Sequence, residues 1–351
     1  MVYLDYAATT PLLKCVRKAM HEAEELYFAN ASALHTPGHM ALNGIEACRE
    51  LLAKMVGCDP GELIFTSGAT ESNNTVMHIF EGCKIEVSPY EHHSIMEAAR
   101  VYRGENQPTL YSYMLANNEI GEFIDLPQKS NSNEYLHSDL TQVLGKLPIN
   151  VKKLGLDYAT FSAHKIGGPI GVGALYVRGG APYKPFMIGG NQEGKRRGGT
   201  YNVVGIIGLK AALEYVRDNN IYNIYDNKVR DLRDTLARRI LQEIPGSSLN
   251  TNIGKGKSLP NILNVSFHAA EGESIQLYLD AEGIIVSTGS ACAAGDIKPS
   301  HVLMAKTGDA EVAHSSIRFS FGPDNTMGDV DHVMRVLPGI ISRLQGMSTI
   351  R

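Results

Sequence analysis

The 351-residue sequence has only five cysteines, and they lack the spacings of a metal site or of a disulfide framework. No two of them form a Cys-x-x-Cys pair, and an odd number of cysteines without a framework is typical of a reducing compartment. The N-terminal residues contain no basic region followed by an apolar stretch, so we expect no signal peptide. Together these absences predict a cytoplasmic protein.

Long hydrophobic runs and a strong net charge are also absent. No stretch of about 18 apolar residues occurs, so we expect no membrane-spanning helix. The formal net charge is −4, which provides no basic field of the kind that a dedicated nucleic-acid-binding protein needs. Apolar residues make up 43% of the chain, which excludes intrinsic disorder. We therefore expect neither a membrane nor a nucleic acid as a direct partner.

Short apolar runs alternate with helical stretches along the first two thirds of the chain. The runs are bounded by turn residues and predict buried strands at 63–66, 84–88, 110–115, 135–138, 158–162 and 173–177. Helical periodicity predicts helices at 11–29, 39–56, 94–102, 202–219 and 225–243. This alternation is typical of a mostly parallel sheet between helices.

The last third of the chain has its own set of elements. It predicts three strands and a closing helix, at 262–266, 283–287, 316–320 and 327–344. The sequence thus predicts a large α/β domain over 12–222 and a smaller α+β domain over 223–351. Residues 1–11 belong to the smaller domain. Because open α/β sheets bind ligands beyond the carboxyl ends of their strands, we expect the chemistry where strands pass into loops.

The segment Thr66-Ser-Gly-Ala-Thr-Glu-Ser-Asn-Asn74 follows one of these strands. It predicts a glycine turn and then a helix that opens with hydroxyl residues. Free backbone N–H groups at such a helix N-terminus favour a phosphate, and the same residue types also serve as ordinary helix caps. The segment alone leaves both interpretations open.

Asp139 closes a predicted strand, and Gln142 lies three residues further on. A carboxylate at a strand end can pair with a protonated ring nitrogen, and the amide can reach a neighbouring ring oxygen. An aspartate that caps a helix is the alternative.

Lys165 follows the next strand and precedes a Gly-Gly-Pro turn. Lysine is seldom buried unless it is paired, and a desolvated lysine with a lowered pKa is what a Schiff base requires. A lysine in a surface loop is the alternative.

Cys292 and Arg318 are candidates near the C-terminus. Cys292 lies among Gly, Ser and Ala residues, which give a side chain little to pack against and so favour a reactive thiol over a buried one. Arg318 lies in an alternating strand, and its planar fork suits a bidentate contact with a carboxylate. A surface salt bridge is the alternative for Arg318.

A Schiff-base lysine, a ring-nitrogen aspartate, a phosphate site and a carboxylate-binding arginine together indicate pyridoxal 5'-phosphate acting on an amino acid. The sequence resembles the cysteine desulfurases of the class V, fold-type I pyridoxal-phosphate family. The resemblance runs nearly end to end, through Tyr3–Pro11, Ser67–Ser72, Glu91–Ser94, Asn117–Gly121, Asp139 with Gln142, Ser162–Lys165, Gly189–Thr200, Gly289–Cys292 and Ser316–Ser320. It implies a large domain with a mostly parallel sheet of the seven-stranded type, and a smaller α+β domain that holds the catalytic Cys loop.

The resemblance also implies roles for the cofactor residues. Lys165 is the Schiff-base lysine and later moves a proton, Asp139 holds the ring nitrogen, and Gln142 contacts the ring hydroxyl. His92 stacks on the ring and acts in acid–base steps. The phosphate cradle consists of Ala69, Thr70, Ser162 and His164, with Thr200 reaching the site of the partner in a homodimer.

For the substrate, the resemblance implies that Asn118 contacts both cofactor and substrate and that Arg318 binds the carboxylate of L-cysteine. Cys292 is the nucleophile that takes up sulfur as a persulfide, with L-alanine as product. The persulfide then passes to a sulfur-acceptor protein of iron–sulfur cluster biosynthesis, tRNA thiolation or DNA phosphorothioation. A selenocysteine lyase or related β-elimination enzyme, and a sulfur-transfer scaffold with weak turnover, are the alternatives.

Two segments are shorter than in typical members of this family. They are 95–115 and 122–136, and the second has too few apolar residues for the usual helix. The glycine-rich segment also departs from the usual pattern, because Gly194 replaces its first arginine, while Arg197 keeps the second. The shortening affects the surface on which sulfur acceptors dock more than it affects the chemistry.

Overall fold

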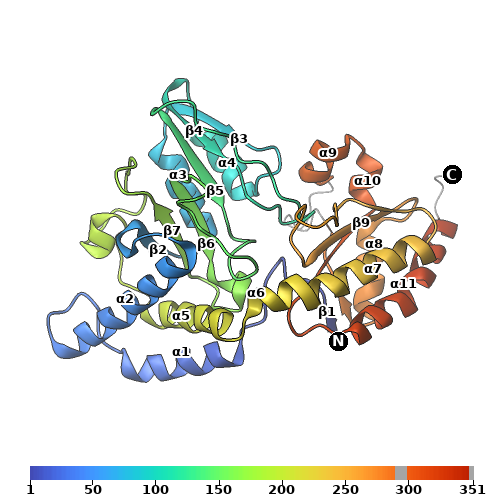
Figure 1. Ribbon diagram of the computed structural model, residues 1–351, viewed down its shortest axis with the longest axis horizontal. Helices are drawn as coiled ribbons and strands as arrows, with labels where there is room; N and C mark the ends of the chain where they lie inside the picture. The colour runs from blue at the N-terminus through green and yellow to red at the C-terminus, as the bar shows by residue number, and fades with distance from the viewer. Residues whose placement is uncertain (289–298, 348–351) are drawn as a thin grey trace. The chain divides into compact units, whose positions relative to one another are not determined.

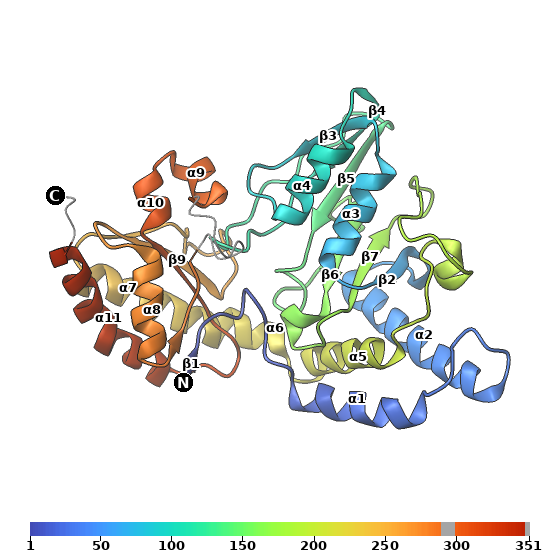
Figure 2. The same ribbon diagram turned by 180° about the vertical axis from the view of Figure 1, so that it is seen from behind.

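The computed structural model describes residues 1–288 and 299–347 of the chain. Contacts divide the chain into two compact units, and Figures 1 and 2 show them from opposite sides. Unit 1 comprises residues 1–9, 116–123 and 222–351, and unit 2 comprises residues 10–115 and 124–221.

Residues 116–123 lie within the large domain predicted over 12–222, yet they belong to unit 1. Their backbone is tied to that unit by hydrogen bonds. The Leu259 N–H donates to the carbonyl of Gly121, and the Thr251 hydroxyl donates to the carbonyl of Ile120, each at 2.8 Å. The apolar pattern of the sequence does not reveal such backbone contacts.

The described residues of unit 2 form a six-stranded sheet in the order β2-β7-β6-β5-β4-β3. Strands β3, β4, β5 and β6 are parallel, and β7 is antiparallel to both β6 and β2. The strand bounds are β2 Leu63–Thr66, β3 Cys83–Val87, β4 Asn106–Ser112, β5 Glu134–Asp139, β6 Tyr158–Ser162 and β7 Gly173–Val177. All strands except β7 therefore end at the same edge of the sheet, and the predicted mostly parallel sheet is confirmed.

The sheet has one strand fewer than the seven that the resemblance implied, within the part of the chain that the structure describes. Only residues 103–105 separate α4 (His93–Tyr102) from β4. A connection between parallel strands needs about a dozen residues or more, so this linker has no room for another strand and crossover. β3 pairs with β4 directly and is an edge strand.

Helices α3 (Ala69–Ile79) and α4 cover one face of this sheet, as Figure 2 shows. Apolar side chains of the two helices pack against alternate residues of the strands, since successive strand residues point to opposite faces. The core of this layer is formed by Val76, Met77, Phe80, Ile95, Ala99, Ile85, Leu110, Tyr158 and Leu175. The other long helices of the unit pack on one another and are α1 Lys14–Leu26, α2 Thr36–Val56 and α5 Val203–Asp218.

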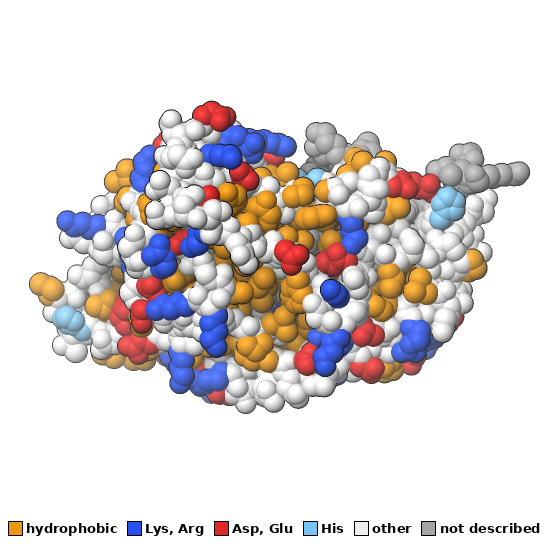
Figure 3. Space-filling model, turned by 45° about the horizontal axis from the view of Figure 1, so that its top comes forward, with side chains coloured by type: hydrophobic (Ala, Val, Ile, Leu, Met, Phe, Trp, Pro, Cys, Tyr) orange, Lys and Arg blue, Asp and Glu red, His pale blue; other side chains and the backbone are white. Residues whose placement is uncertain are grey.

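The opposite face of β3, β4 and β5 has no covering helix in the described part of the chain (Figure 1). This face is polar: Lys84 Nζ pairs with Glu86 Oε1 at 2.6 Å, and Glu86 lies opposite Tyr111 on β4. Residues 124–133 form no helix, as the sequence predicted. The shortened segments therefore leave a hydrophilic sheet face. On the face shown in Figure 3, Lys and Arg side chains are interspersed with Asp and Glu side chains.

Unit 1 contains a three-stranded antiparallel sheet, β11-β9-β8, and a parallel pair, β1-β10. Its strands are β1 Val2–Tyr3, β8 Ser247–Leu249, β9 Ile262–Phe267, β10 Ile284–Ile285 and β11 Ser316–Ser320. Its helices are α7 Arg230–Glu243, α8 Gly272–Ala281, α9 His301–Thr307, α10 Ala310–His314 and α11 Met327–Met347. Among the described residues, no helix has the length and apolar character that crossing a membrane requires.

The helix predicted over 225–243 is present, but it begins at Ile221 and contains a π-helical turn. The short helix α6 (Ile221–Ile224) leads into a π-helical turn at Tyr225–Val229, and α7 follows. Helices α8, α9 and α10 were not predicted, because they are short and the hydrophobic period of a short segment is ambiguous. Helix α2 begins at Thr36, three residues before the predicted start, because the His35 side chain accepts a hydrogen bond from the Gly38 N–H and caps it.

A buried ion pair fixes the glycine-rich segment 189–200 to the rest of unit 2. Arg49 on α2 donates from Nη1 and Nη2 to the two carboxylate oxygens of Glu193, each at 2.8 Å. Both side chains are buried. Glu193 has a φ of 49°, a left-handed conformation that is unfavourable for a residue with a Cβ. The same carboxylate accepts from the Phe65 N–H at 3.2 Å, so several contacts hold the strained residue in place.

We predict that Arg49→Met lowers the free energy of unfolding by about 3–5 kcal/mol, because it leaves the Glu193 carboxylate buried without its partner. Urea denaturation at pH 7 measures this change. Arg100→Met is the matched control, since Arg100 pairs with Glu97 on the surface of α4 and its loss should cost no more than about 1 kcal/mol. Equal losses in the two variants would contradict the prediction.

Candidate active site

The candidate site of unit 2 lies at the carboxyl ends of β2, β5 and β6. The neighbouring strands β5 and β6 end at Asp139 and Ser162. A one-turn helix, Ala163–Ile166, follows β6 and contains Lys165, and α3 begins at Ala69 shortly after β2. This edge is where open α/β sheets bind their ligands.

The Asp139 carboxylate is buried and held by two donors. Asn73 Nδ2 donates to Oδ2 at 3.0 Å, and the Thr141 N–H donates to Oδ1 at 2.9 Å. A carboxylate can accept about four hydrogen bonds, so each oxygen keeps capacity for a further donor. The predicted partner of a ring nitrogen is therefore fixed in orientation. Asn73, which fixes it, was not identified as a functional residue from the sequence.

The same asparagine connects Asp139 to His92. Asn73 Nδ2 also donates to Ser94 Oγ at 2.9 Å, and Ser94 Oγ lies 2.8 Å from His92 Nδ1. The Ser94 N–H donates to His92 Nδ1 at 3.1 Å and so caps α4. Because Nδ1 accepts this bond, a neutral His92 has its proton on Nε2.

Glu91 is a buried carboxyl group that the sequence analysis did not select. The Met114 N–H donates to its Oε1 at 2.5 Å. Burial raises its pKa well above the ordinary value, and the charge of Asp139 acts in the same direction. Burial therefore favours the protonated form of the Glu91 carboxyl. Its place directly before His92, in the loop that follows β3, was the only sequence signal.

Gln142 is buried beside a second residue that the sequence analysis missed, Lys146. Lys146 Nζ donates to the backbone oxygen of Gln142 at 2.9 Å and to its Oε1 at 3.3 Å. Burial, followed by repulsion from Lys165, lowers the pKa of Lys146 to about 7. Burial and the charges of Lys165 and Lys146 lower the pKa of His164 to about 4. A lysine within the apolar run VLGKLPI was the available signal.

The N-terminus of α3 fits the predicted phosphate site. Gly68 precedes it with a φ of 152°, a conformation that favours glycine, and Thr70 in the first turn is exposed. The first N–H groups of a helix have no partners within the helix and attract anions. The Glu71 carboxylate in this turn is bound at both oxygens by Arg197, at 2.8 and 3.0 Å. Arg197 thus neutralises the acidic group next to the anion site.

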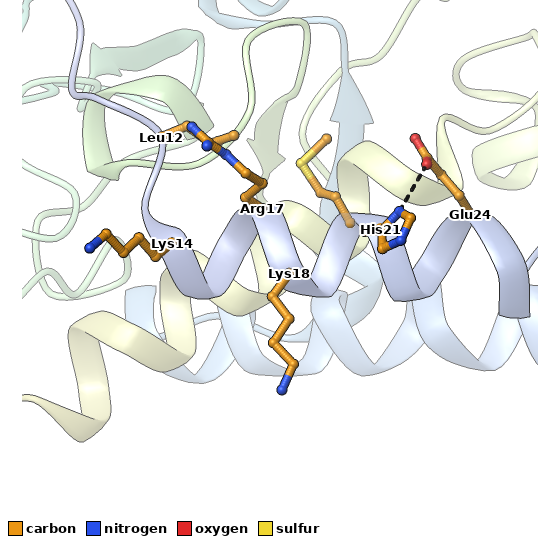
Figure 4. Close-up of a pocket in the computed structure, with 7 residues that line it drawn as sticks. Leu12, Lys14, Arg17, Lys18, His21 and Glu24 are labelled. Carbon is orange, nitrogen blue, oxygen red and sulfur yellow. Dashed lines mark ion pairs between the residues drawn. The ribbon is translucent and has the colours of Figure 1, made fainter.

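Thr200 is exposed, and with Thr66 and Ser67 it lines a hollow of about 170 Å³ in unit 2. A larger hollow of about 590 Å³ lies along α1 and is lined by Leu12, Lys14, Arg17, Lys18, Met20, His21 and Glu24 (Figure 4). Figure 4 shows the side chains of Lys14, Arg17 and Lys18 pointing in different directions. Their charges do not converge, and none of the predicted site residues lines this hollow.

The predicted substrate residues belong to unit 1, where Arg318 lies on β11. Its Nη1 donates to the backbone oxygen of Asn118 at 3.0 Å, and its Nη2 donates to Asp5 Oδ1 at 2.8 Å. The structure therefore brings Asn118 and Arg318 together, but through the backbone of Asn118. Asp5, which lies in the N-terminal motif, was not selected from the sequence.

A second missed residue of unit 1 is Glu119, next to Asn118. It is buried, and Ser300 Oγ donates to its Oε2 at 2.5 Å. Burial raises the pKa of Glu119 to about 7. Its carboxyl group therefore titrates close to neutral pH while it holds the residue that caps α9.

Cys292 lies outside the described residues, together with the motif Gly289-Ser-Ala-Cys292. Of the other cysteines, Cys48 is buried and Cys15 is exposed. Burial raises the pKa of Cys58 to about 12 and raises that of Cys48 as well. Thiols with raised pKa values are poor nucleophiles, so the surroundings of Cys48 and Cys58 are those of unreactive thiols.

The chemistry of the side chains around the edge of unit 2 fits pyridoxal phosphate. An oriented carboxylate, a buried amide, an amine and a helix N-terminus correspond to the ring nitrogen, ring oxygen, aldehyde and phosphate of that molecule. Asp139, Gln142, Lys165 and α3 supply these four groups from neighbouring strand ends.

Comparisons with known proteins identify the family of this chain. The model of the class-V aminotransferase family matches residues 2–106 and 103–333. The cysteine desulfurase IscS of Dictyoglomus turgidum is 39% identical over 385 aligned positions, which cover 99% of this chain and 96% of that protein. Because the alignment is longer than 351 residues, that protein has residues without a counterpart here.

Solved structures are similar as well. A NifS-like protein superposes with a TM-score of 0.86 at 33% identity, covering 97% of this chain and 99% of that chain. A structure described as SspA in complex with cysteine gives a TM-score of 0.76 at 28% identity, covering 93% of this chain and 100% of that chain.

The fold is that of a pyridoxal-phosphate enzyme of fold type I. The chain belongs to the class-V aminotransferase family and is a cysteine desulfurase of the IscS-like group. Membership of this family implies pyridoxal phosphate as the cofactor.

We predict that acid destabilises the protein through His137. This side chain is fully buried on β5, where its ring nitrogens contact Ser112 Oγ at 2.8 Å and Thr160 Oγ1 at 3.1 Å. Burial lowers its pKa, so the folded state keeps His137 neutral while the unfolded chain takes up a proton below about pH 6.5. Stability from this group is present above that pH and is lost as the pH falls.

Protonation of His137 in the unfolded chain should lower the free energy of unfolding by about 1 kcal/mol between pH 7.5 and pH 5.5. Urea denaturation at the two pH values measures it, and His137→Asn should reduce the loss by that amount. If the variant lost as much stability as the wild type, His137 would not be the group responsible.

Proposed function

We propose that the protein removes the sulfur atom of L-cysteine, releases L-alanine and leaves a persulfide on Cys292, from which the sulfur passes to an acceptor protein. The observation that carries this proposal is the placement of Asp139, Gln142 and Lys165 at one edge of the sheet of unit 2. The resemblance to cysteine desulfurases along the whole chain supports it, and so does the similarity to a structure described as holding cysteine.

In this proposal each group of pyridoxal phosphate meets a matching residue. Asp139 holds the ring nitrogen, Gln142 the ring oxygen, and Lys165 forms the covalent linkage. The phosphate is bound by Ala69, Thr70, Ser162 and His164. When bound, the cofactor withdraws electrons from the Cα atom of the substrate and so makes its proton acidic.

The amino group of the substrate would displace Lys165 from its linkage to the cofactor, and the freed Lys165 amine then acts as the base that removes the Cα proton. A base must be neutral before it accepts a proton. Lys146 and Lys165 repel each other when both are charged, which favours an uncharged amine in this pair. His92 takes part in the acid–base steps. Its Nδ1 accepts a hydrogen bond from the Ser94 N–H, so the neutral ring carries its proton on Nε2. Asn118 and Arg318 bind the substrate, and Arg318 contacts the carboxylate of L-cysteine.

Sulfur leaves the substrate by thiolate attack. The Cys292 thiolate forms an S–S bond with the sulfur of cysteine while the C–S bond breaks, and the electron pair of the broken bond stays on carbon. That carbon takes up a proton, and the product leaves as alanine. A thiolate of the acceptor protein then attacks the outer sulfur of the persulfide and releases the Cys292 thiolate.

We further propose a homodimer in the cytoplasm. Thr200 is exposed at the end of the glycine-rich segment, as a residue that reaches the phosphate site of a partner subunit must be. A reducing compartment keeps the Cys292 thiol and the persulfide from forming unwanted disulfides.

We predict that Lys165→Ala abolishes the covalent linkage to the cofactor. Borohydride should fix pyridoxal phosphate to the wild type but not to the variant, and turnover of cysteine should fall by at least about a hundredfold because the base is lost. Absorption spectra and mass spectrometry measure the linkage. Lys152→Ala, which removes a surface lysine paired with Asp59, is the control and should behave like the wild type. An unchanged linkage in Lys165→Ala would overturn its assignment.

We predict that Cys292→Ser keeps the cofactor spectrum but forms no persulfide. Sulfide and alanine production should fall by at least about a hundredfold, because a hydroxyl at neutral pH is a far weaker nucleophile than a thiolate. Mass spectrometry after incubation with cysteine detects the persulfide. Cys15→Ser removes an exposed cysteine and is the matched control. Persulfide formation or turnover at the wild-type rate in Cys292→Ser would remove Cys292 from the mechanism.

A further inference from the structure

We propose that Lys146 is a positioning residue, which fixes the side-chain amide of Gln142 so that its NH₂ group faces the ring oxygen of the cofactor. This inference rests on the proposed function, because that function takes Gln142 as the neighbour of the ring oxygen. It adds a residue that the family resemblance did not supply.

The first support is the burial of Lys146 without a counter-ion. The side chain is about 1% exposed, and in the part of the chain that the structure describes no carboxylate pairs with it. Burying an amine in this way is costly, and lysine is almost never buried unless it is paired. Both hydrogen bonds of the amine go to a single residue, Gln142.

The second support is the direction of the hydrogen bond to the side chain. The two ends of a glutamine amide have nearly the same shape, and one is an acceptor while the other is a donor. Lysine can only donate, so Lys146 selects the oxygen, Oε1, at 3.3 Å. The NH₂ end of Gln142 must then turn away from Lys146. A ring oxygen that carries negative charge is an acceptor and needs that donor.

Electrostatics act in the same direction. The titratable groups that face Lys146 are Lys165 and His164, both on the one-turn helix after β6. A positive charge near the cofactor linkage and a donor to the ring oxygen both disfavour protonation of the linkage. Removing Lys146 should therefore raise the pH at which the bound cofactor changes its absorption band.

The test is a pH titration of the absorption spectrum of the holoenzyme. We expect Lys146→Met to raise the midpoint of the spectral change by about one pH unit. We also expect its Kd for pyridoxal phosphate to rise by about two- to tenfold, the value of one hydrogen bond. Lys146→Arg keeps the charge and the donors, and its midpoint should stay close to the wild type. Lys210→Met removes a lysine of α5 paired with Glu214 and is the matched control.

Whether Lys146 acts through Gln142 is decided by repeating the change in a Gln142→Leu background. The shift caused by Lys146→Met should be clearly smaller there, because no amide is left to orient. A shift of the same size in both backgrounds would show a pure charge effect and overturn the positioning role. An unchanged midpoint in Lys146→Met would overturn it as well.

A second variant covers the case in which Met is not tolerated at this buried position. Lys146→Gln removes the charge and offers both a donor and an acceptor, so it no longer selects one end of the Gln142 amide. Its midpoint should also rise, and an unchanged midpoint would overturn the proposal. Failure of the proposed function has a different signature, since the wild type would then show no band that depends on Lys165.

Discussion

One side-chain amide, that of Asn73, connects three elements of unit 2. It donates to Asp139 at the end of β5 and to Ser94 in the first turn of α4, and Ser94 contacts His92. Asn73 itself lies on α3, whose N-terminus is the candidate phosphate site. A shift of α3 against the sheet would therefore move the carboxylate, the imidazole and the anion site together. The buried hydrogen bonds make these three features one rigid group, since breaking any of them leaves a buried polar atom without a partner.

Most of the sheet and the principal site residues could be predicted from the sequence. Strand ends are visible as apolar runs that stop at polar residues, and Asp139, Ser162 and Lys165 stand directly at such points. Parallel neighbours bring these ends together, so a one-dimensional pattern predicts a three-dimensional cluster. Gln142 was found because its spacing from Asp139 matched a known motif. The role of Cys292 stays a prediction.

Glu91 and Lys146 could not be identified in the same way. In sequence each is an ordinary charged residue. Only the packing of other segments around each side chain removes the water that would stabilise its charge. Burial raises the pKa of Glu91 and lowers the pKa of Lys146 to about 7, and burial is a property of the tertiary structure. The six-stranded sheet is a similar case. The shortened segments were visible, but which strand would become the edge depended on the pairing of β3 with β4.

The short linker between α4 and β4 also affects how the chain folds. With residues 103–105 as the only linker, the paired positions of β3 and β4 are 23 to 25 residues apart in sequence, as for Cys83 with Asn106 and Val87 with Ser112. Another strand and helix between them would make this separation longer. Closing a shorter stretch of chain costs less entropy, by about 0.6 kcal/mol for each halving of its length. Contacts between residues near in sequence also speed folding. The short linker between α4 and β4 thus lowers the contact order of unit 2.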